Sequence, residues 1–332
     1  MTQPSRWRAA SLGLVTVGMT VIFLCVLLEA ATRLAADTGL NFDLEMWKYA
    51  RTLKQRATNP LIGHEHKPRG RAFLMGVDVE INEAGHRDQS TSVARQPGVG
   101  RIVMLGDSIT FGWGVRAEDV AATRLEAMFQ RTGNPVEVIN AGVGNYNTVQ
   151  EVEAFMAKDA ANSPDLAILN YYVNDAEPVP SYRERGFLAR HSQAWVFLTG
   201  RFDALWRMSG KRPKWDQYYL DLYETGGWAA AKDAMHRLAE FCRQRRVKLM
   251  IVSWPELHGV HDYRLQRITD LVRAVAEAEG VVFVDLLEAL DDQDSSKLWV
   301  TVPDPHPNAF ANALAAEYLF PFVQAEMVKP AR

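Results

Sequence analysis

Hydrophobic positions beyond residue 100 alternate between short apolar runs and longer stretches in which apolar residues recur every three or four positions. The short runs are typical of buried strands and the longer stretches of amphipathic helices. We expect strands over 101–105, 136–140, 165–172, 247–254 and 281–287. We expect helices over 117–133, 148–163, 227–246, 263–280 and 308–320, with Pro321 kinking or ending the last one.

Strands that alternate with helices predict a parallel sheet covered by helices on both faces. Five strands suit a doubly wound, flavodoxin-like α/β fold. Residues 181–226 interrupt the alternation, and Trp195, Phe197, Phe202 and Trp206 give this stretch an amphipathic pattern. We interpret it as a helical insertion, whose aromatic face packs on the domain, forms a lid over a site or lies on a membrane.

The N-terminal region carries an uncharged run of 20 residues, Ala9–Leu28. A helix needs about 20 apolar residues to cross a bilayer, so this run predicts one transmembrane helix. Arg6 and Arg8 precede the run, while Glu29 and Asp37 are among the charges after it, which favours a cytoplasmic N-terminus. We therefore expect a single-pass protein of the inner (cytoplasmic) membrane whose main domain is periplasmic or extracellular. A cleaved signal peptide is the alternative, although its apolar core is usually shorter, about 7–15 residues.

The region between this run and the first expected strand is mixed and polar. We interpret residues 36–100 as a juxtamembrane linker with a short hairpin over Ala72–Asp88 that turns at Gly85. The expected organisation is therefore an anchor over residues 1–35, the linker, and a domain over residues 101–328.

Composition narrows the function classes. The formal net charge of -3 gives no sign of the basic face that a nucleic-acid-binding protein usually shows, so no nucleic-acid partner is expected. There are two cysteines: Cys25 lies in the uncharged run and Cys242 in an expected helix, which makes a disulfide between them improbable. Neither has the spacing of a zinc ribbon, and we expect no cofactor.

Polar motifs follow all five expected strands, the last after a further loop. They are Gly106–Ser108, Asn140–Asn145, Tyr171–Asp175, Ser253–His258 and Asp304–Asn308. The carboxyl ends of the strands in a doubly wound sheet meet at one edge, where ligands bind. The sequence therefore predicts that these motifs share one rim.

Three residues of this rim suit nucleophilic catalysis. The Ser108 hydroxyl is a poor nucleophile until a base takes its proton, and His306 can be that base because imidazole titrates near neutral pH. Asp304, two residues before His306, can hold the imidazole tautomer. Taken alone, Gly106–Ser108 favours an ordinary strand-to-helix turn with capping residues, and a phosphate loop would need a lysine that this motif lacks. The presence of His306 and Asn174 on the same rim favours the nucleophile.

Attack on an ester also needs hydrogen-bond donors for the oxyanion that forms. The backbone N–H groups of Ser108 and of the Gly144–Asn145 turn are candidates, together with the side-chain amide of Asn174.

The order of these motifs resembles the SGNH (GDSL) hydrolase superfamily over roughly residues 100–325. The matching blocks are GDSI at Gly106–Ile109, NAGVGN at Asn140–Asn145, VND at Val173–Asp175 and DPHPN at Asp304–Asn308. The resemblance implies the SGNH hydrolase fold, Ser108 as nucleophile, and a backbone donor after the second strand. The sequence departs from the family pattern at Asn145 and Tyr172, where the family has glycines, and Asp304 stands two rather than three residues before its histidine.

Four further polar residues on the rim are candidates for substrate contact: Asp107, Asp175, Glu256 and His258. His258 is also part of an HxxH pattern, but two histidines on a polar loop are more often surface residues, so no metal is expected.

The resemblance implies a serine esterase or acylhydrolase that acts on acyl esters. Family members on such anchors often act on surface glycans, so we expect an O-acetyl ester of a cell-surface polysaccharide or another ester as substrate. Three alternatives stay open. They are an O-acyltransferase with the same triad, a lipid or lysophospholipid esterase, and a non-catalytic glycan-binding or scaffold subunit.

Overall fold

The central sheet contains all five strands that the sequence predicts. The computed structural model describes residues 6–89, 95–180, 186–302 and 304–328. The strands are β5 (Gly100–Leu105), β6 (Val136–Asn140), β7 (Leu166–Tyr171), β8 (Lys248–Ser253) and β9 (Val282–Asp285). All neighbours pair in parallel, in the order β6-β5-β7-β8-β9. This order is the flavodoxin-like arrangement, so the predicted doubly wound α/β fold is confirmed.

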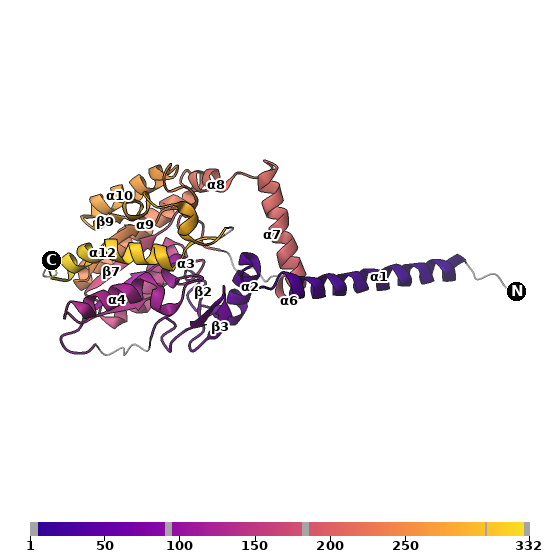
Figure 1. Cartoon of the computed structure of the whole chain (residues 1–332), viewed down its shortest axis with the longest axis horizontal. Helices are drawn as coiled ribbons and strands as arrows, with labels where there is room; N and C mark the ends of the chain where they lie inside the picture. The colour runs from indigo at the N-terminus through magenta and orange to yellow at the C-terminus, as the bar shows by residue number, and fades with distance from the viewer. Residues whose placement is uncertain (1–5, 90–94, 181–185, 303, 329–332) are drawn as a thin grey trace.

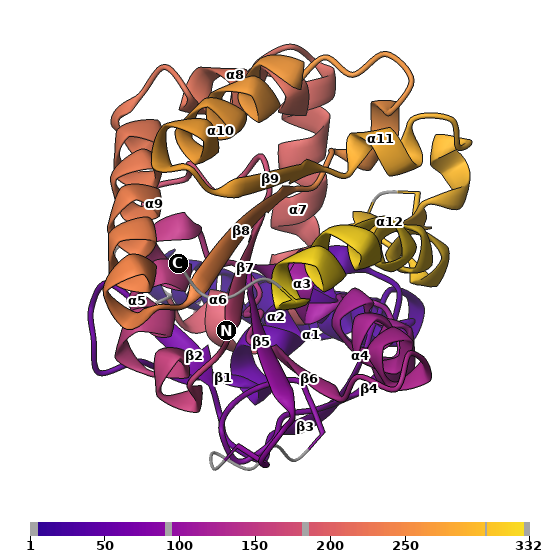
Figure 2. The same ribbon diagram turned by 90° about the vertical axis from the view of Figure 1, so that its left-hand side faces the viewer.

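Helices cover both faces of this sheet. They are α4 (Ala121–Arg131), α5 (Thr148–Ala157), α9 (Gly226–Arg245), α10 (Gln266–Glu279) and α12 (Ala309–Val328). Helix α4 packs on α12 and α5 packs on α9, and Figure 2 shows these two pairs on opposite sides of the sheet. Because both faces are covered, β5 and β7 are buried almost throughout, which explains their continuous apolar runs.

The last helix continues to Val328, so the expectation that Pro321 ends it is wrong. A proline inside a helix removes one backbone hydrogen bond, but it does not prevent the flanking turns from packing. Leu319 and Val323, on either side of Pro321, are fully buried. Their burial outweighs the local cost of the proline.

Helix α1 (Arg6–Ala35) projects from the domain as one long helix (Figure 1). Its stretch Ala10–Ala35 has a mean hydropathy of 2.5, and its most apolar part is not buried at all. By length and composition this helix can cross a membrane, and a signal sequence would meet the same criteria.

Much of the expected linker is folded onto the domain. It forms α2 (Phe42–Thr52) and two antiparallel pairs, β1 (Lys54–Arg56) with β2 (His64–His66) and β3 (Arg71–Leu74) with β4 (Val77–Glu80). Tyr49 and Leu53 of α2 share a buried cluster with Phe111 and Trp113. The linker interpretation is therefore wrong for residues 42–80, whose buried apolar side chains pack on one another and on Phe111 and Trp113 of the domain.

The expected hairpin exists, but it turns earlier than predicted. Leu74 pairs with Val77, which leaves Met75 and Gly76 as a two-residue turn. Both have positive φ, 50° and 75°, the conformation that joins the strands of a tight hairpin. Gly85 has a φ of 84° but lies in a loop beyond β4.

The interruption of the α/β alternation is helical. Of its residues, 181–185 lie outside the described part of the chain, and the rest include the helices α6 (Phe187–His191), α7 (Gln193–Met208) and α8 (Trp215–Leu222). A further antiparallel pair, β10 (Trp299–Thr301) with β11 (Asp304–Pro307), precedes α12. The remaining short elements are α3 (Ser108–Phe111), α11 (Leu287–Leu290), η1 (Ala117–Asp119), η2 (Asp159–Asn162), η3 (Leu257–Gly259) and η4 (Ser295–Lys297).

Candidate active site

Ser108 is the first residue of α3, and Gly106 and Asp107 separate it from the end of strand β5. Asp107 caps this helix, since its carboxylate accepts the Ile109 N–H at 2.8 Å. Gly106 makes the turn with a φ of 156°, and a Cβ there would lie 2.0 Å from Thr110 Oγ1. The strand and the tight turn therefore place Ser108 at the carboxyl edge of the sheet, where its own N–H has no intrahelical acceptor.

Hydrogen bonds join Ser108, His306 and Asp304. His306 Nε2 lies 2.8 Å from Ser108 Oγ, and His306 Nδ1 lies 2.5 Å from Asp304 Oδ1. Nδ1 therefore donates its proton to the carboxylate, and Nε2 can accept from the serine hydroxyl. Asp304 and His306 both belong to β11, and residues two apart in a strand point to the same face. The two-residue spacing thus gives a direct contact between the acid and the base.

Aromatic side chains surround this pair. Phe42 stacks on the His306 imidazole with ring centres 5.9 Å apart, and the centre of the Trp113 ring lies 6.2 Å from it. Trp113 Nε1 donates to Asp304 Oδ2 at 3.0 Å, and Asp304 is fully buried. Burial lowers the pKa of His306, but the negative charges of Asp304 and Asp107 outweigh it, and the pKa is raised above its ordinary value.

Asn145 has the backbone conformation that the glycine of the family pattern would supply. Its φ is 64°, in the left-handed region that asparagine tolerates. In the part of the chain that the structure describes, the N–H groups of Asn145 and Ser108 have no hydrogen-bond partner. Gly144 differs from the prediction, because its N–H donates to the Tyr49 hydroxyl at 2.9 Å. The Gly144 N–H is therefore already used and is not a free oxyanion donor.

Two basic side chains hold the peptide group between Gly144 and Asn145. Lys54 Nζ donates to Gly144 O at 2.5 Å and to Asn145 Oδ1 at 2.8 Å. His64 Nε2 lies 3.1 Å from the same carbonyl oxygen. Burial and the Lys54 charge lower the pKa of His64 to about 3, so His64 donates as a neutral imidazole. A cation on the carbonyl oxygen polarises the peptide and makes the Asn145 N–H a stronger donor.

Tyr49 connects the Gly144–Asn145 turn to buried groups of the domain. Its hydroxyl accepts from Gly144 and donates to His66 Nε2 at 2.6 Å, and His66 Nδ1 donates to Gly85 O at 3.0 Å. Burial lowers the pKa of His66 to about 3, so the neutral ring accepts the tyrosine proton. The chain of donors and acceptors is complete, which fixes the position of the turn.

Asn174 lies next to the serine loop, as predicted from the rim. Its Nδ2 is 3.4 Å from Asp107 Oδ2, and Ser108 Oγ is 3.3 Å from the same oxygen. Asn174 Oδ1 is buried and has no partner among the described residues. Burial raises the pKa of Asp107, which is consistent with a carboxyl group enclosed by this loop.

The residues expected to contact substrate have other partners in the structure. Asp107 caps α3, and the buried Asp175 accepts a backbone N–H of its own turn at 3.1 Å. Both therefore hold loops in place rather than face a substrate. Glu256 and His258 pair with each other at the rim, and His258 Nε2 lies 3.4 Å from Val302 O, close to the β10–β11 pair.

Sequence reasoning missed Tyr49, Lys54 and Arg87, which all support the site. Arg87 is buried, and its guanidinium donates to three carbonyl groups at and just beyond the end of α3, where a helix leaves its carbonyls unpaired. Burial lowers the pKa of Arg87 to about 10. The position of Arg87 directly after Gly85 and His86 was the only signal in the sequence that it could have a special role. Tyr49 and Lys54 lie in no motif.

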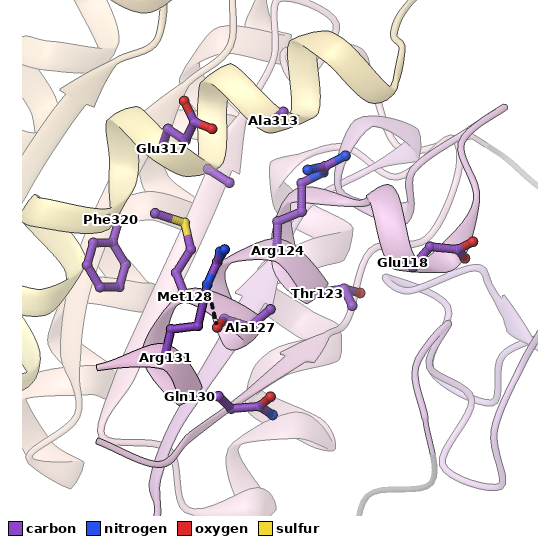
Figure 3. Close-up of a pocket in the computed structure, with 11 residues that line it drawn as sticks. Glu118, Thr123, Arg124, Ala127, Met128, Gln130, Arg131, Ala313, Glu317 and Phe320 are labelled. Carbon is purple, nitrogen blue, oxygen red and sulfur yellow. Dashed lines mark hydrogen bonds between the residues drawn. The ribbon is translucent and has the colours of Figure 1, made fainter. Parts of the chain in front are cut away.

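A separate hollow of about 870 Å³ lies at the surface between α4 and α12 (Figure 3). Arg124, Arg131 and Glu317 are among the residues that line it, whereas Ser108 and His306 are not. Within the described ranges, no three His, Cys, Asp or Glu side chains come together in a way that would hold a metal ion.

Comparison with known proteins agrees with the motifs. The GDSL-like lipase/acylhydrolase family model matches residues 104–314, whereas no curated protein matches the chain. A lipase/acylhydrolase from Enterococcus faecalis is 16% identical, with a TM-score of 0.44 over 70% of this chain and 99% of that one. A GDSL-like lipase from Bacteroides thetaiotaomicron is 14% identical, with a TM-score of 0.42 over 71% and 92% of the two chains. A two-domain esterase active on acetylated mannans is 16% identical, with a TM-score of 0.45 over 70% and 51%. Since the family model covers more than half of the sequence, the chain belongs to the GDSL-like lipase/acylhydrolase family.

Proposed function

We propose that the protein is a serine ester hydrolase in which Ser108, His306 and Asp304 form the catalytic triad. The observation that carries the proposal is the continuous hydrogen-bonded path from Ser108 Oγ through both nitrogens of His306 to Asp304. Membership of the acylhydrolase family supports the same reaction class.

The geometry supports a two-step acyl transfer. His306 Nε2 takes the Ser108 proton as Oγ attacks the acyl carbon, and the imidazolium then gives that proton to the departing alcohol. The acyl group is left as an ester on Ser108. The same nitrogen next takes a proton from water, whose oxygen attacks the acyl carbon. His306 returns the proton to Ser108 Oγ as the carboxylic acid leaves.

Three donors are proposed to stabilise the oxyanion: the N–H groups of Ser108 and Asn145 and the Asn174 amide. Donors fixed before the reaction begins stabilise the transition state most, and the contacts behind Asn145 meet that condition. Asn174 contacts Asp107 only at 3.4 Å, so little is lost when its amide turns to the oxyanion.

The proposed substrate is a short acyl ester, with an O-acetyl group of a cell-surface polysaccharide as the first candidate. Ser108 is only 5% exposed and Phe42 stacks on His306, so little surface around the reacting atoms is open to a bulky acyl group. Such a site favours acetyl over long acyl chains. Helix α1 supports a place in the membrane, and Arg6 and Arg8 before its apolar run favour a domain outside the cytoplasm.

The test is ester hydrolysis by the full chain in detergent. We expect p-nitrophenyl acetate to be cleaved faster than the octanoate, and Ser108→Ala to abolish the activity while the melting temperature stays unchanged. Thr123→Ala, in the hollow between α4 and α12, is the matched control and should keep full activity. Activity that survives in Ser108→Ala would rule out the serine mechanism. A preference for octanoate would rule out the acetyl assignment and favour the lipid esterase.

A further inference from the structure

Helix α7 carries a row of large apolar side chains that the described part of the chain leaves uncovered. Trp195, Phe202, Leu205 and Trp206 are 46, 57, 56 and 49% exposed. Their spacing places them on one face of the helix. A helix of 16 residues with so much exposed apolar surface is not expected to stay formed in water by itself, so this face needs a cover.

Other residues of α7 and α6 are packed on α2, which fixes the position of α7. Gly200 approaches α2 so closely that a Cβ would lie 2.2 Å from Asp43 Oδ2. Arg201 pairs with Asp43 at 3.1 Å, and Trp47 Nε1 donates to Ala189 O at 2.9 Å. The exposed row therefore keeps a fixed direction relative to the domain.

Glu29 of α1 caps the N-terminus of α7. Its carboxylate accepts hydrogen bonds from Ser192 Oγ at 2.7 Å and from the N–H groups of Gln193 and Ala194 at 3.1 Å. The uncharged run Ala9–Leu28 ends directly before Glu29. At a rise of about 1.5 Å per residue, that run spans about 30 Å, the thickness of the hydrocarbon core of a bilayer. Glu29 and the start of α7 thus fall at the boundary between acyl chains and headgroups.

The direction of α7 agrees with a position at the boundary between acyl chains and headgroups. Figure 1 shows α1 lying horizontally and α7 running upright from its end, and α7 is still upright in the turned view of Figure 2. When α1 crosses a bilayer, α7 therefore runs along the bilayer surface. Residues 186–214, which include α7, contain six Lys or Arg and one Asp, in a chain of net charge -3. Three of the six pair with Asp43 or Asp203, and the exposed Arg190, Lys211 and Lys214 form no ion pair with the described residues. An aromatic face combined with basic residues is typical of a helix that lies on anionic lipid.

We propose that α7 lies in the headgroup region of the membrane that α1 crosses, with its aromatic row toward the acyl chains and the flanking Arg190, Lys211 and Lys214 beside anionic headgroups. This inference rests on the proposed membrane anchor. It has a consequence for the site, because α7 packs on α2 and Phe42 at the start of α2 stacks on His306. Helix α2 then connects the membrane surface directly to the candidate triad.

The test uses the full chain in nanodiscs of anionic lipid, prepared with one copy in each disc and, separately, with two. An environment-sensitive fluorophore is attached to a cysteine at Phe202→Cys or, as the matched control, at Phe322→Cys on α12, both in a Cys25→Ala background. Phe322 is also exposed, and Cys242 is buried and does not compete for the label. Wild-type protein labelled at Cys25 reports on α1. Lipids that carry a quencher at the top of the acyl chain are then introduced.

We expect strong quenching and a blue-shifted emission at Phe202→Cys and at Cys25, and neither at Phe322→Cys. Quenching at Cys25 alone would overturn the position of α7 while leaving the anchor intact. A blue shift at Phe202→Cys that needs two copies in a disc would also overturn it, because a second chain would then be the cover. Without quenching at Cys25 the anchor fails, and the inference about α7 falls with it, whereas ester hydrolysis is measured separately.

Discussion

Replacing Lys54 by methionine tests whether a residue outside the proposed catalytic triad strengthens the proposed oxyanion hole. The change removes the cation from the Gly144 carbonyl and keeps most of the bulk of the side chain. The triad distances do not involve Lys54, so the attack geometry is retained. What is lost is the charge behind the peptide whose other end is the Asn145 N–H.

The size of the effect follows from distances. Lys54 Nζ lies 2.5 Å from Gly144 O. Standard peptide dimensions then put the cation about 7 Å from an oxyanion that the Asn145 N–H binds. At an effective dielectric constant of about 20, two unit charges at that separation attract by about 2 kcal/mol. A loss of about 2 kcal/mol in the transition state lowers kcat by about 30-fold. The neutral carbonyl of the bound ester gains little from the cation, so KM should hardly change.

The assay is the rate of p-nitrophenyl acetate hydrolysis by the full chain in detergent, at saturating and at low substrate. Lys54→Arg keeps the charge and should recover much of the lost kcat. Lys67→Met is the matched control, because Lys67 Nζ also donates to a backbone carbonyl, Arg51 O at 2.8 Å, but lies on no part of the oxyanion turn. Its kcat should equal that of the wild type.

The reasoning fails if Lys54→Met keeps kcat within about twofold of wild type. It also fails if the loss appears in KM or is matched by a lower melting temperature, since Lys54 would then serve only the fold.

The remaining predictions concern pH and stability. Asp304→Asn should lower kcat/KM by about 10⁴-fold, as in other triads, and should move the acid limb of the pH–rate profile to lower pH, because the charge that raises the His306 pKa is gone. Tyr49→Phe leaves the Gly144 N–H without a partner and should lower the free energy of unfolding in urea by about 2 kcal/mol. His66 has a pKa of about 3 in the folded chain and an ordinary one when unfolded, so the unfolded state binds more protons below about pH 6.5 and stability should fall toward pH 4. A smaller fall is expected in His66→Gln.

The residues at the rim of the sheet were predictable because the strand pattern and the sequence motifs indicate the same place. Ser108 follows a continuous apolar strand, and a parallel sheet must bring that strand end to the same edge as the other motifs. The left-handed conformation of Asn145 was also within reach, since few other residues tolerate it. The contact between His306 and Asp304 follows from the two-residue period of a strand, which places both side chains on the same face.

Tyr49 and Lys54 were out of reach for a different reason. Each contacts a turn about 90 residues further along the chain, a contact that no local pattern indicates. The helix that carries Tyr49 did leave a signal, since Phe42, Met46, Tyr49 and Leu53 recur at helical spacing. Their region forms a short helix and short strands, whose apolar side chains pack on one another and on Phe111 and Trp113 of the domain. Pro321 failed as a stop signal because packing on α4 decides the length of the last helix.

The stacking of Phe42 on His306 has a consequence for how this protein is divided into modules. Only six residues separate the end of α1 from Phe42, and the family match begins 62 residues beyond it. A chimaera that joins residues 104–314 to a foreign anchor would carry the proposed triad. It would lose Phe42, which stacks on His306, and Tyr49 and Lys54, which hold the Gly144–Asn145 turn. The proposed function therefore depends on a longer stretch of the chain than the family model covers. Substitutions in α2 or β1 can change the reaction rate without altering a family motif.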